Sequence, residues 1–434
     1  MLKNRETLES LVKSIVGDLR KALMIVGPRQ VGKTSLMRLA ENALQTKGFR
    51  TMYFDVERPE DFEILTRGAD FVSRSYDVDV IFIDEVHKLP EWQRFVKLMV
   101  DYHSEKKLVL SSSNMAAVRL PGGDALVGRL VEFELYPLSF REYLTFREEE
   151  RIKPLAADPQ SAGSKSVLQI LDDFIVFGGF PEVALKFGDE PQVSQVLSSI
   201  FMRYERYELA AILKDDFVPF RSFFTLLAAN IGNLLSHERI ATELGLTVYR
   251  IKKFLALMEH TFLLKILRPF GRTKRKEITR RPKIYFVDTG LRNWAVRDYA
   301  PLAVRSDRGP LVENCVFVEL LRQLNPLREE LFFWRRPNGT EVDFVLKIDG
   351  QRLVAIEVKF TSMKTPKISK ALRAFAELYS PEKVIVVTKD SYHQSKLGAI
   401  PVEFVPLAAF LMNPKQYILH SAFGYRPFTL WWQT

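Results

Sequence analysis

The sequence predicts an α/β protein built from several domains, and three observations support this expectation. In the N-terminal third, short apolar and β-branched runs alternate with segments whose apolar residues recur at helical spacing. The region 142–215 has helical spacing that is broken at Pro154, Pro159, the turn 178–181 and Pro191, and beyond residue 330 short strand-like runs follow one another across turns. A chain of 434 residues also exceeds one ordinary hydrophobic core. We divide it into four regions, which are residues 1–141, 142–215, 216–287 and 288–434.

The composition excludes several classes of protein. Hydrophobic residues make up 47% of the chain and charged residues 27%, as in folded soluble proteins. No apolar run reaches the ~18–20 residues that span a bilayer, and no apolar stretch follows the N-terminal residues 1–6 as in a signal peptide. Cys315 is the only cysteine, which excludes a disulfide framework and a cysteine-based zinc site. We expect a cytoplasmic protein without membrane contact, and its net charge of +10 weakly favours an acidic partner such as nucleic acid.

A phosphate-binding loop is the most specific motif in the chain, because it fits G-x-x-x-x-G-K-[ST] in full between a strand-like run at 22–26 and a helical pattern. The glycines allow backbone N–H groups to point at phosphate oxygens, and the helix N-terminus adds partial positive charge. Lys33 is expected to reach the β- and γ-phosphates and Thr34 to bind Mg²⁺. The motif therefore predicts binding of ATP with Mg²⁺. Its residues are Gly27, Pro28, Arg29, Gln30, Val31, Gly32, Lys33, Thr34 and Ser35.

A second motif, Val-Asp-Val-Ile-Phe-Ile-Asp-Glu at residues 78–85, is a β-branched run that ends in two acids. This is the Walker B pattern, in which Asp84 would hold the hydrated Mg²⁺. Glu85 would orient and deprotonate the attacking water. We interpret the nearby His87 as a loop residue without a catalytic role.

Two further residues are candidates for ATP hydrolysis. The strand expected at 107–110 ends in polar residues, of which Asn114 could polarise the water, with Ser113 as the alternative. Asn114 could equally be a helix N-cap. Arg129 follows a glycine-rich loop and precedes a strand-like run at 130–135, a position suited to an arginine finger aimed at a neighbouring subunit's γ-phosphate. Pairing of Arg129 with a surface acid is the alternative.

Taken together, these motifs resemble the AAA+-type ATPases of archaea and bacteria that join this module to a further C-terminal domain. The resemblance rests on Gly-Pro-Arg-Gln-Val-Gly-Lys-Thr, Ile-Phe-Ile-Asp-Glu-Val-His-Lys, Gly-Arg-Leu and Tyr-Pro-Leu-Ser-Phe in this order. The turn at 177–182 resembles that family's turn in the helical lid. The resemblance implies a parallel sheet of strand order 5-1-4-3-2, a helical lid over residues 142–215 and homo-oligomerisation.

The region 237–258 carries a helix-turn-helix pattern in which Gly245 makes the turn and Thr247 caps the second helix. The second helix would bury an apolar face and expose basic residues to phosphates or base edges, as in a winged-helix domain. A basic segment at 272–281 could form the tip of the wing, although winged helices also dock proteins. The residues that we expect to contact nucleic acid are Arg250, Lys252, Lys253, Arg272, Lys274 and Arg275.

The C-terminal third contains Asp343 and, on the next strand-like run, Glu357-Val358-Lys359. This matches the D…(D/E)-x-K pattern of restriction-endonuclease-like nucleases. Asp343 and Glu357 could share Mg²⁺ or Mn²⁺, which activates a water, and Lys359 would position that water. Glu313, on a preceding helix, could be an additional acid of the site. Val342 stands where many such nucleases have proline, and a degenerate nuclease fold or an ordinary sheet with a Glu–Lys pair is the alternative.

The fold class expected is therefore α/β, with a P-loop AAA+ parallel sheet, a helical lid, a winged-helix domain and a C-terminal restriction-endonuclease-like α/β domain. The function expected is ATP hydrolysis coupled to action on DNA, with a metal-dependent nuclease domain, in repair, recombination or defence. The alternative is a regulatory ATPase switch whose C-terminal domains bind a protein partner without nuclease activity.

Overall fold

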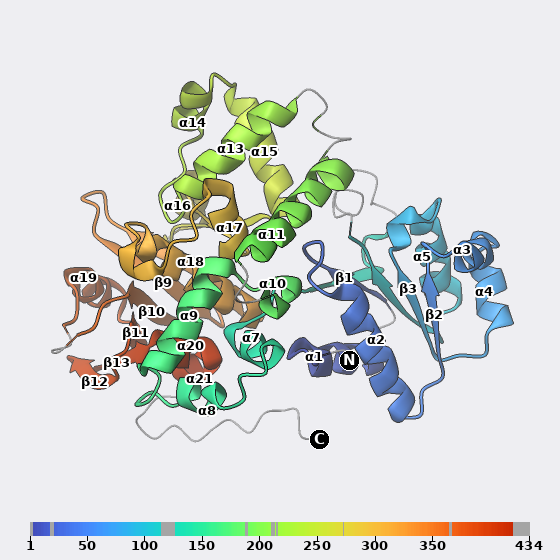
Figure 1. The fold of residues 1–434 in the computed structure, drawn as a ribbon, viewed down its shortest axis with the longest axis horizontal. Coiled ribbons are helices and arrows are strands. Elements are labelled where there is room, and N and C mark those ends of the chain that lie inside the picture. Colours follow the sequence, from blue (N-terminus) through green and yellow to red (C-terminus); the bar gives the residue numbers. More distant parts are fainter. Residues whose placement is uncertain are drawn as a thin grey trace.

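The computed structural model describes residues 3–17, 21–113, 126–186, 190–209, 213, 216–271, 273–363 and 367–419. The N-terminal domain, blue to cyan in Figure 1, lies on one side of the molecule, and the C-terminal sheet, orange to red, lies on the other. Helices from the middle of the chain lie between and above them. No helix among the described residues combines the length and the apolar character that crossing a membrane requires.

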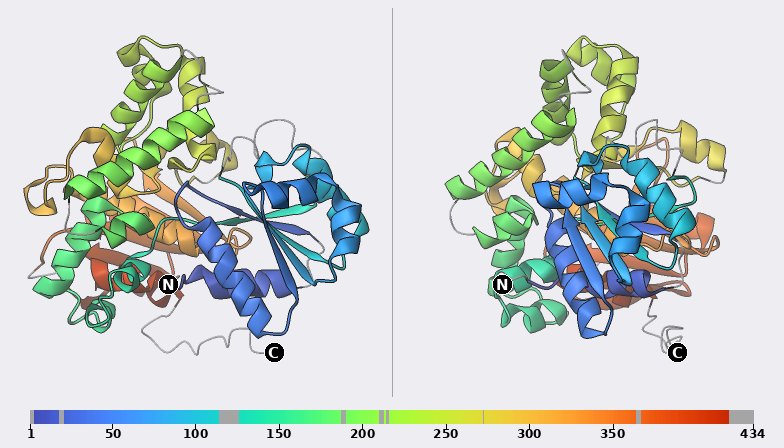
Figure 2. Two further views of the ribbon diagram at one scale, coloured as in Figure 1. Left: turned by 45° about the vertical axis from the view of Figure 1, so that its right-hand side comes forward. Right: turned by 90° about the vertical axis from the view of Figure 1, so that its right-hand side faces the viewer.

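The N-terminal domain is built on a five-stranded parallel sheet of order β2-β3-β4-β1-β5, which confirms the order that the resemblance implied. Its strands are β1 (Ala22–Val26), β2 (Thr51–Asp55), β3 (Val80–Asp84), β4 (Lys107–Ser111) and β5 (Leu130–Glu134). Its helices are α1 (Thr7–Val16), α2 (Lys33–Thr46), α3 (Pro59–Thr66), α4 (Ala69–Ser75), the 3₁₀ turn η1 (Val86–Lys88) and α5 (Trp92–Tyr102). Strands β1 and β3 are buried along their whole length because helices cover both faces of the sheet (Figure 2).

The middle of the chain is helical, as predicted for the lid. Its elements are α7 (Phe140–Phe146), α8 (Ile152–Ala157), α9 (Lys165–Phe177), α10 (Pro181–Leu185), α11 (Glu190–Tyr204), η3 (Glu205–Leu209) and α13 (Phe217–Ala229). Pro154, Pro181 and Pro191, which we expected to break helices, lie in the first turns of α8, α10 and α11. Proline is tolerated there because the N–H groups of a first turn have no partner within the helix.

Two elements from later in the chain, helix α17 (Thr289–Val296) and the 3₁₀ turn η5 (Leu302–Val304), lie in the region that we assigned to the C-terminal domain. In the structure, α17 packs against α9, α11 and α13. Leu302 of η5 also donates its N–H to Asp172 of α9 at 3.1 Å, so by packing both elements belong with the helical middle.

The glycine turn between α9 and α10 is held against the start of α17. A Cβ atom on Gly178, which has φ of +84°, would lie 2.3 Å from the Asp288 carboxylate, and Gly179 N–H donates to the same carboxylate at 2.7 Å. On the other side, a Cβ atom on Gly290 would lie 1.9 Å from the carbonyl oxygen of Phe177. Only glycine allows this close approach of two backbone segments.

The predicted helix-turn-helix is present as α14 (His237–Leu244) and α15 (Val248–His260), with Gly245 left-handed at the turn and Thr247 capping α15. An antiparallel pair, β6 (Leu264–Leu267) and β7 (Lys283–Phe286), follows these helices. The segment between the strands, which we expected to form a wing tip, contains the short helix α16 (Lys274–Thr279). Arg272 lies outside the described residues.

The C-terminal domain contains a six-stranded sheet of order β12-β13-β11-β10-β9-β8, in which β10, β11 and β13 are parallel and the other pairs antiparallel. Strand β12 was not predicted. The strands are β8 (Glu329–Arg335), β9 (Glu341–Ile348), β10 (Arg352–Lys359), β11 (Lys383–Thr388), β12 (His393–Leu397) and β13 (Ile400–Pro406). The helices are α18 (Arg308–Gln323), α19 (Lys370–Tyr379), α20 (Leu407–Met412) and α21 (Pro414–Leu419). A continuous hydrophobic core runs from the lid helices through α13–α15 to one face of this sheet.

Candidate functional site

The predicted phosphate-binding loop joins β1 to α2 and is shaped by residues with positive φ. Gly27 has φ of +153°, and a Cβ atom there would lie 2.1 Å from the carbonyl oxygen of Leu135. Gln30 and Gly32 have φ of 59° and 96°, which turns the backbone toward the N-terminus of α2. This cradle fits the phosphates of a nucleotide.

Lys33, the first residue of α2, folds back over the loop and is 5% exposed. Its Nζ donates to the carbonyl oxygens of Gly27 at 3.0 Å and Pro28 at 2.8 Å. Thr34, the predicted Mg²⁺ ligand, is exposed at the start of α2. From the lid, the Tyr204 hydroxyl accepts a hydrogen bond from the Arg29 N–H at 3.3 Å, so the lid contacts the loop directly.

Arg5, which sequence reasoning missed, forms hydrogen bonds that hold the same loop in place. Its guanidinium donates to the carbonyl oxygen of Val31 at 2.9 Å and to that of Tyr136 at 2.9 Å. It also forms a buried ion pair with Glu142 of α7 at 2.7 Å, in which each side chain is 5% exposed. Burial by itself would raise the pKa of Glu142, but the Arg5 guanidinium outweighs it and holds this pKa below its usual range.

The Walker B acids lie at the carboxyl edge of the sheet, next to polar residues at the end of β4. Asp84 is 3% exposed and accepts hydrogen bonds from the Tyr53 hydroxyl at 2.8 Å and from the Ser111 hydroxyl. Glu85 accepts two hydrogen bonds from Ser113, from its N–H at 3.0 Å and from its hydroxyl at 2.7 Å. Ser113, our alternative, thus contacts the Glu85 carboxylate directly, and Asn114 lies outside the described residues.

His87 lies closer to the Walker B acids than its interpretation as a loop residue implied. Its Nδ1 is 3.3 Å from Glu85 Oε2 and 3.0 Å from the Ser112 hydroxyl. Burial lowers the pKa of His87 below its ordinary value, although Glu85 acts in the opposite direction. The imidazole is therefore neutral near pH 7.

Arg129 immediately precedes β5, at the edge of the sheet opposite to the phosphate-binding loop. The parallel register of β1 with β5 pairs Ala22 with Leu130, so a full strand, about 16 Å, separates Arg129 from the loop of its own chain. Its Nε donates to Asp101 at 2.7 Å, as in our surface-pair alternative. From this position the Arg129 side chain does not contact the phosphate-binding loop of its own chain.

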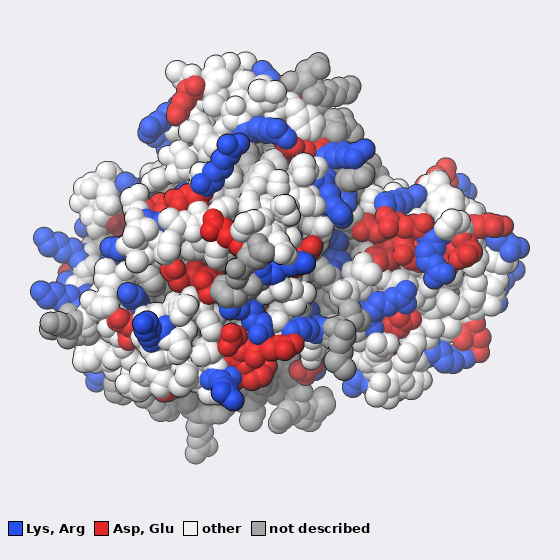
Figure 3. All heavy atoms as spheres, viewed as in Figure 1, with Lys and Arg blue, Asp and Glu red and all other residues white. Residues whose placement is uncertain are grey.

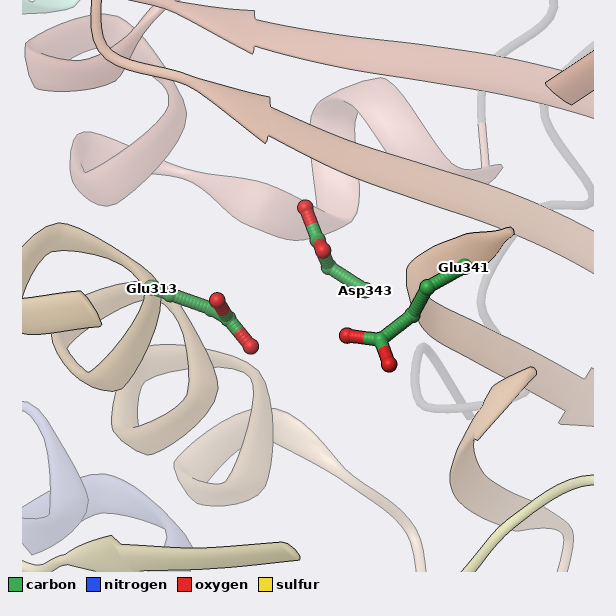
Figure 4. Close-up of side chains that lie close together, drawn as sticks. All are labelled: Glu313, Glu341 and Asp343. Carbon is green, nitrogen blue, oxygen red and sulfur yellow. The ribbon is translucent and has the colours of Figure 1, made fainter. Parts of the chain in front are cut away.

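In the C-terminal domain, three carboxylates converge between α18 and the start of β9 (Figure 4). They belong to Glu313, Glu341 and Asp343, whose carboxylate oxygens lie within 4.8 Å of one another, and we call them the carboxylate cluster. Asp343 also accepts a hydrogen bond from the Val358 N–H at 2.7 Å, which ties it to β10. Burial, followed by the charge of Glu313, raises the pKa of Asp343 well above its usual value.

The predicted Glu357 and Lys359 lie beside the carboxylate cluster on β10. Glu357 is 2% exposed, accepts a hydrogen bond from the Ser369 hydroxyl at the start of α19, and pairs with Lys359 Nζ at 2.8 Å. The structure thus brings Asp343, Glu357 and Lys359 together on neighbouring strands. Sequence reasoning missed Glu341, although its period-2 spacing from Asp343 was a usable signal.

Lys283 enters the carboxylate cluster from β7, outside the C-terminal sheet. It is 2% exposed, and its Nζ lies 2.9 Å from Glu313 and also pairs with Glu341. Burial would lower the pKa of Lys283, but Glu313 and Glu341 raise it above its ordinary value. The site therefore offers only oxygen donors together with a built-in cation, and hard divalent ions such as Mg²⁺ and Mn²⁺ suit such donors.

The basic residues predicted to contact nucleic acid differ in their surroundings. Lys252 and Lys253 are exposed on α15. Arg250 forms an ion pair with Asp216, and Lys274 forms ion pairs with Glu277 at 3.1 Å and Glu330 at 2.9 Å. Arg275 is exposed. On the face seen in Figure 3, Lys and Arg are interspersed with Asp and Glu.

Comparison with known families and proteins identifies the N-terminal domain but not the rest of the chain. A family model described as an AAA domain matches residues 19–144, and two domains of unknown function, DUF8612 and DUF4143, match residues 168–301 and 308–410. An uncharacterized protein of Haemophilus influenzae is 27% identical and aligns with 93% of this chain and 98% of its own length. An uncharacterized protein of Methanocaldococcus jannaschii is also 27% identical, over 77% of this chain and 74% of its own length.

Among solved structures, the replication initiator DnaA bound to AMPPCP and single-stranded DNA has 18% identity and a TM-score of 0.27, covering 60% of this chain and 90% of its own. Cdc6p from Pyrobaculum aerophilum has 12% identity and a TM-score of 0.29, covering 68% of this chain and 95% of its own. Likenesses this low carry no inference about the present chain. The sheet order, the phosphate-binding loop and the family match together show that its N-terminal domain is a P-loop ATPase domain of the AAA type.

Proposed function

We propose that this chain is an ATP-hydrolysing AAA+ protein that acts on DNA through a metal-dependent nuclease site in its C-terminal domain. The observation that carries the proposal is the meeting of Asp343, Glu357 and Lys359 on neighbouring strands, beside Glu313 from α18. Repair, recombination and defence are the settings in which such an activity would serve.

For ATP hydrolysis, each residue at the carboxyl edge of the sheet has a distinct part. Lys33 and the loop N–H groups would bind the phosphates, while Thr34 and Asp84 would hold Mg²⁺, which neutralises the developing charge. Glu85 would accept the proton of the attacking water. The two hydrogen bonds from Ser113 orient the Glu85 carboxylate for this task.

The proposal includes a homo-oligomer, because the arginine-finger role of Arg129 needs a neighbouring chain. Since the residue lies about one strand length from its own loop, it would act on the ATP site of a neighbour rather than on its own. The ion pair with Asp101 would hold Arg129 until a neighbour docks. A homo-oligomer with shared ATP sites is therefore part of the proposal.

For DNA cleavage, Asp343 and Glu357 would hold a divalent ion, which supplies an activated water and stabilises the phosphate in the transition state. The ammonium of Lys359, paired with Glu357, would orient that water. The element order α18-β8-β9-β10-α19-β11 supports the resemblance to restriction-endonuclease-like domains. The helices α13–α15 with the β6–β7 hairpin support a winged-helix domain, which would present Lys252 and Lys253 to DNA.

A second candidate function is a regulatory ATPase switch without nuclease activity. The observation in its favour is Lys283, because an ammonium that pairs with Glu313 and Glu341 could make the carboxylate cluster a purely structural ion network. In that case the C-terminal domains would bind a protein partner.

Cleavage of labelled linear and branched DNA with Mg²⁺ or Mn²⁺, with and without ATP, separates the two candidates. We expect cleavage by the wild type and none by Asp343→Asn. Asp349→Asn is the matched control, because Asp349 forms an exposed ion pair with Arg328 outside the site. Lys33→Ala shows whether ATP controls cleavage. Absence of cleavage by wild-type protein that hydrolyses ATP would favour the switch.

A further inference from the structure

We infer that Lys283 takes the place of a second metal ion in the carboxylate cluster, so that the nuclease site binds one divalent cation rather than two. The inference rests on the proposed metal-dependent function and defines its metal requirement. It also makes Lys283, from outside the C-terminal sheet, a positioning residue of that site.

Lys283 and a second metal ion would compete for the same carboxylate oxygens. Lys283 Nζ lies 2.9 Å from Glu313 Oε1 and pairs with Oε1 of Glu341, so one ammonium bridges α18 and β9. A divalent ion held by those two oxygens would lie within contact distance of this ammonium, and the two cations would repel each other strongly in a site shielded from water. Asp343 has no ion pair with Lys283 within 4 Å, and Glu357 pairs with Lys359 through Oε1 alone, so Asp343 and the Oε2 atom of Glu357 remain for a metal ion.

The charges of the side chains in and around the carboxylate cluster leave room for one divalent ion. When ionised, Glu313, Glu341, Asp343 and Glu357 carry four negative charges. They are opposed by Lys283, by Lys359 and by Arg335, whose guanidinium pairs with Glu341 at 2.7 Å. The remaining single negative charge is more than neutralised by one divalent ion. A second ion would leave a large uncompensated positive charge in the site.

Lys283 is held in place by the strands around it and by its burial. The residue pairs with Leu267 in the β6–β7 ladder and forms a bridge with Leu234 on its other side. Its side chain is 2% exposed, and the ammonium lies 5.5 Å from the centre of the Phe333 ring. The backbone of Lys283 is therefore fixed, and moving the ammonium away to admit a second metal ion would require the buried side chain to break both of its ion pairs.

The test is the number of Mn²⁺ ions bound by the full-length protein without nucleotide, measured by calorimetric titration and by electron paramagnetic resonance of free Mn²⁺. We expect one ion per wild-type chain, lost in Asp343→Asn. In Lys283→Met, which keeps most of the length of the side chain without its charge, we expect a second ion. Lys383→Met is the matched control, because Lys383 is also buried and paired, with Glu403 at 2.6 Å, but lies outside the site.

Two ions on the wild-type chain, or one ion with unchanged affinity in Lys283→Met, would overturn the inference, as would the absence of Mn²⁺ binding that depends on Asp343. Lys283→Gln provides a second neutral variant if Lys283→Met does not fold. The metal count is independent of cleavage. A wild-type chain that binds one ion but cuts no DNA would refute the nuclease proposal while leaving the role of Lys283 intact.

Discussion

Replacement of Arg5 by methionine tests how the ATPase domain holds its phosphate-binding loop. The substitution keeps most of the side-chain length but removes the guanidinium that contacts Glu142 and the carbonyl oxygens of Val31 and Tyr136. Both partners of the ion pair are 5% exposed, so solvent cannot replace the lost contact. Removing one partner of such a buried pair typically costs about 3–5 kcal/mol, because the other charge stays buried without compensation.

A double-mutant cycle separates the free energy of the Arg5–Glu142 ion pair from the loss of packing. In Glu142→Gln the carboxylate is neutral, so the further change Arg5→Met leaves no buried charge behind. We expect the two losses to be non-additive by about 2 kcal/mol or more, because residues in one buried network couple strongly. Lys13→Met, which removes an exposed ion pair with Glu9 in α1, should change stability by less than about 0.5 kcal/mol.

Amide hydrogen exchange in β1 and α2 is the suitable assay, since a chain of several domains does not unfold in one step. It reports the opening free energy of the ATPase domain alone. Binding of a fluorescent ATP analogue should also weaken in Arg5→Met, because Val31 loses its anchor. An opening free energy within about 1 kcal/mol of the wild type, or additivity within about 0.5 kcal/mol, would refute the reasoning.

Three further predictions concern hydrolysis, the glycine turn and pH. Glu85→Gln should lower the ATPase rate by about 10²–10⁴-fold with ATP binding retained, and Ser113→Ala should lower it less; equal losses would contradict an orienting role for Ser113. Gly290→Ala should cost about 1–3 kcal/mol or more in thermal unfolding, because its Cβ meets the Phe177 carbonyl, whereas Gly309→Ala, with nothing within 4 Å, should be tolerated. Burial raises the pKa of Glu319 to about 7, so the contribution of this residue to stability should be greatest below about pH 4.5 and fall by at most about 3 kcal/mol as the pH rises to 7; the difference in stability between Glu319→Gln and the wild type should therefore depend on pH over this range, and a constant difference would contradict it.

The sequence predicted the local parts of both sites. Lys33, Asp84, Asp343 and Glu357 belong to motifs in which the chemistry and the spacing lie within one loop or one strand. Such motifs place their residues through strand and loop geometry, and in the structure Lys33 begins α2, Asp84 ends β3, and Asp343 and Glu357 lie near the start of β9 and the end of β10. The strand order of the ATPase sheet is not local, and it was predicted only through the resemblance to AAA+-type ATPases.

The residues that were missed come from distant parts of the chain. Arg5 meets Glu142 across 137 positions and Lys283 meets Glu313 across 30, so no local spacing links the partners. A single basic residue in a sequence is expected at the surface, because burial of a charge requires a partner that only the tertiary fold supplies. Lys283 lies two positions beyond the basic segment 272–281 and received no role from the sequence, whereas the structure places it inside the carboxylate cluster.

The basic residues predicted to bind DNA also differ in whether they form ion pairs within the chain. Arg250 and Lys274 are already engaged with acids of the same chain, whereas Lys252 and Lys253 form no ion pair with the residues that the structure describes. A lysine that contacts phosphate releases about 0.9 counterion, so replacing both by alanine should make the salt dependence of DNA affinity shallower by about 2 in log–log slope.

Arg250→Ala should change this slope less, because the intramolecular ion pair with Asp216 competes with phosphate. Fluorescence anisotropy of labelled DNA over a series of salt concentrations measures both variants. An unchanged slope in the Lys252→Ala/Lys253→Ala variant would show that α15 does not face DNA. The two exposed lysines of α15 would then be available to an acidic surface other than DNA. That result would favour the alternative in which the winged-helix region binds a protein partner.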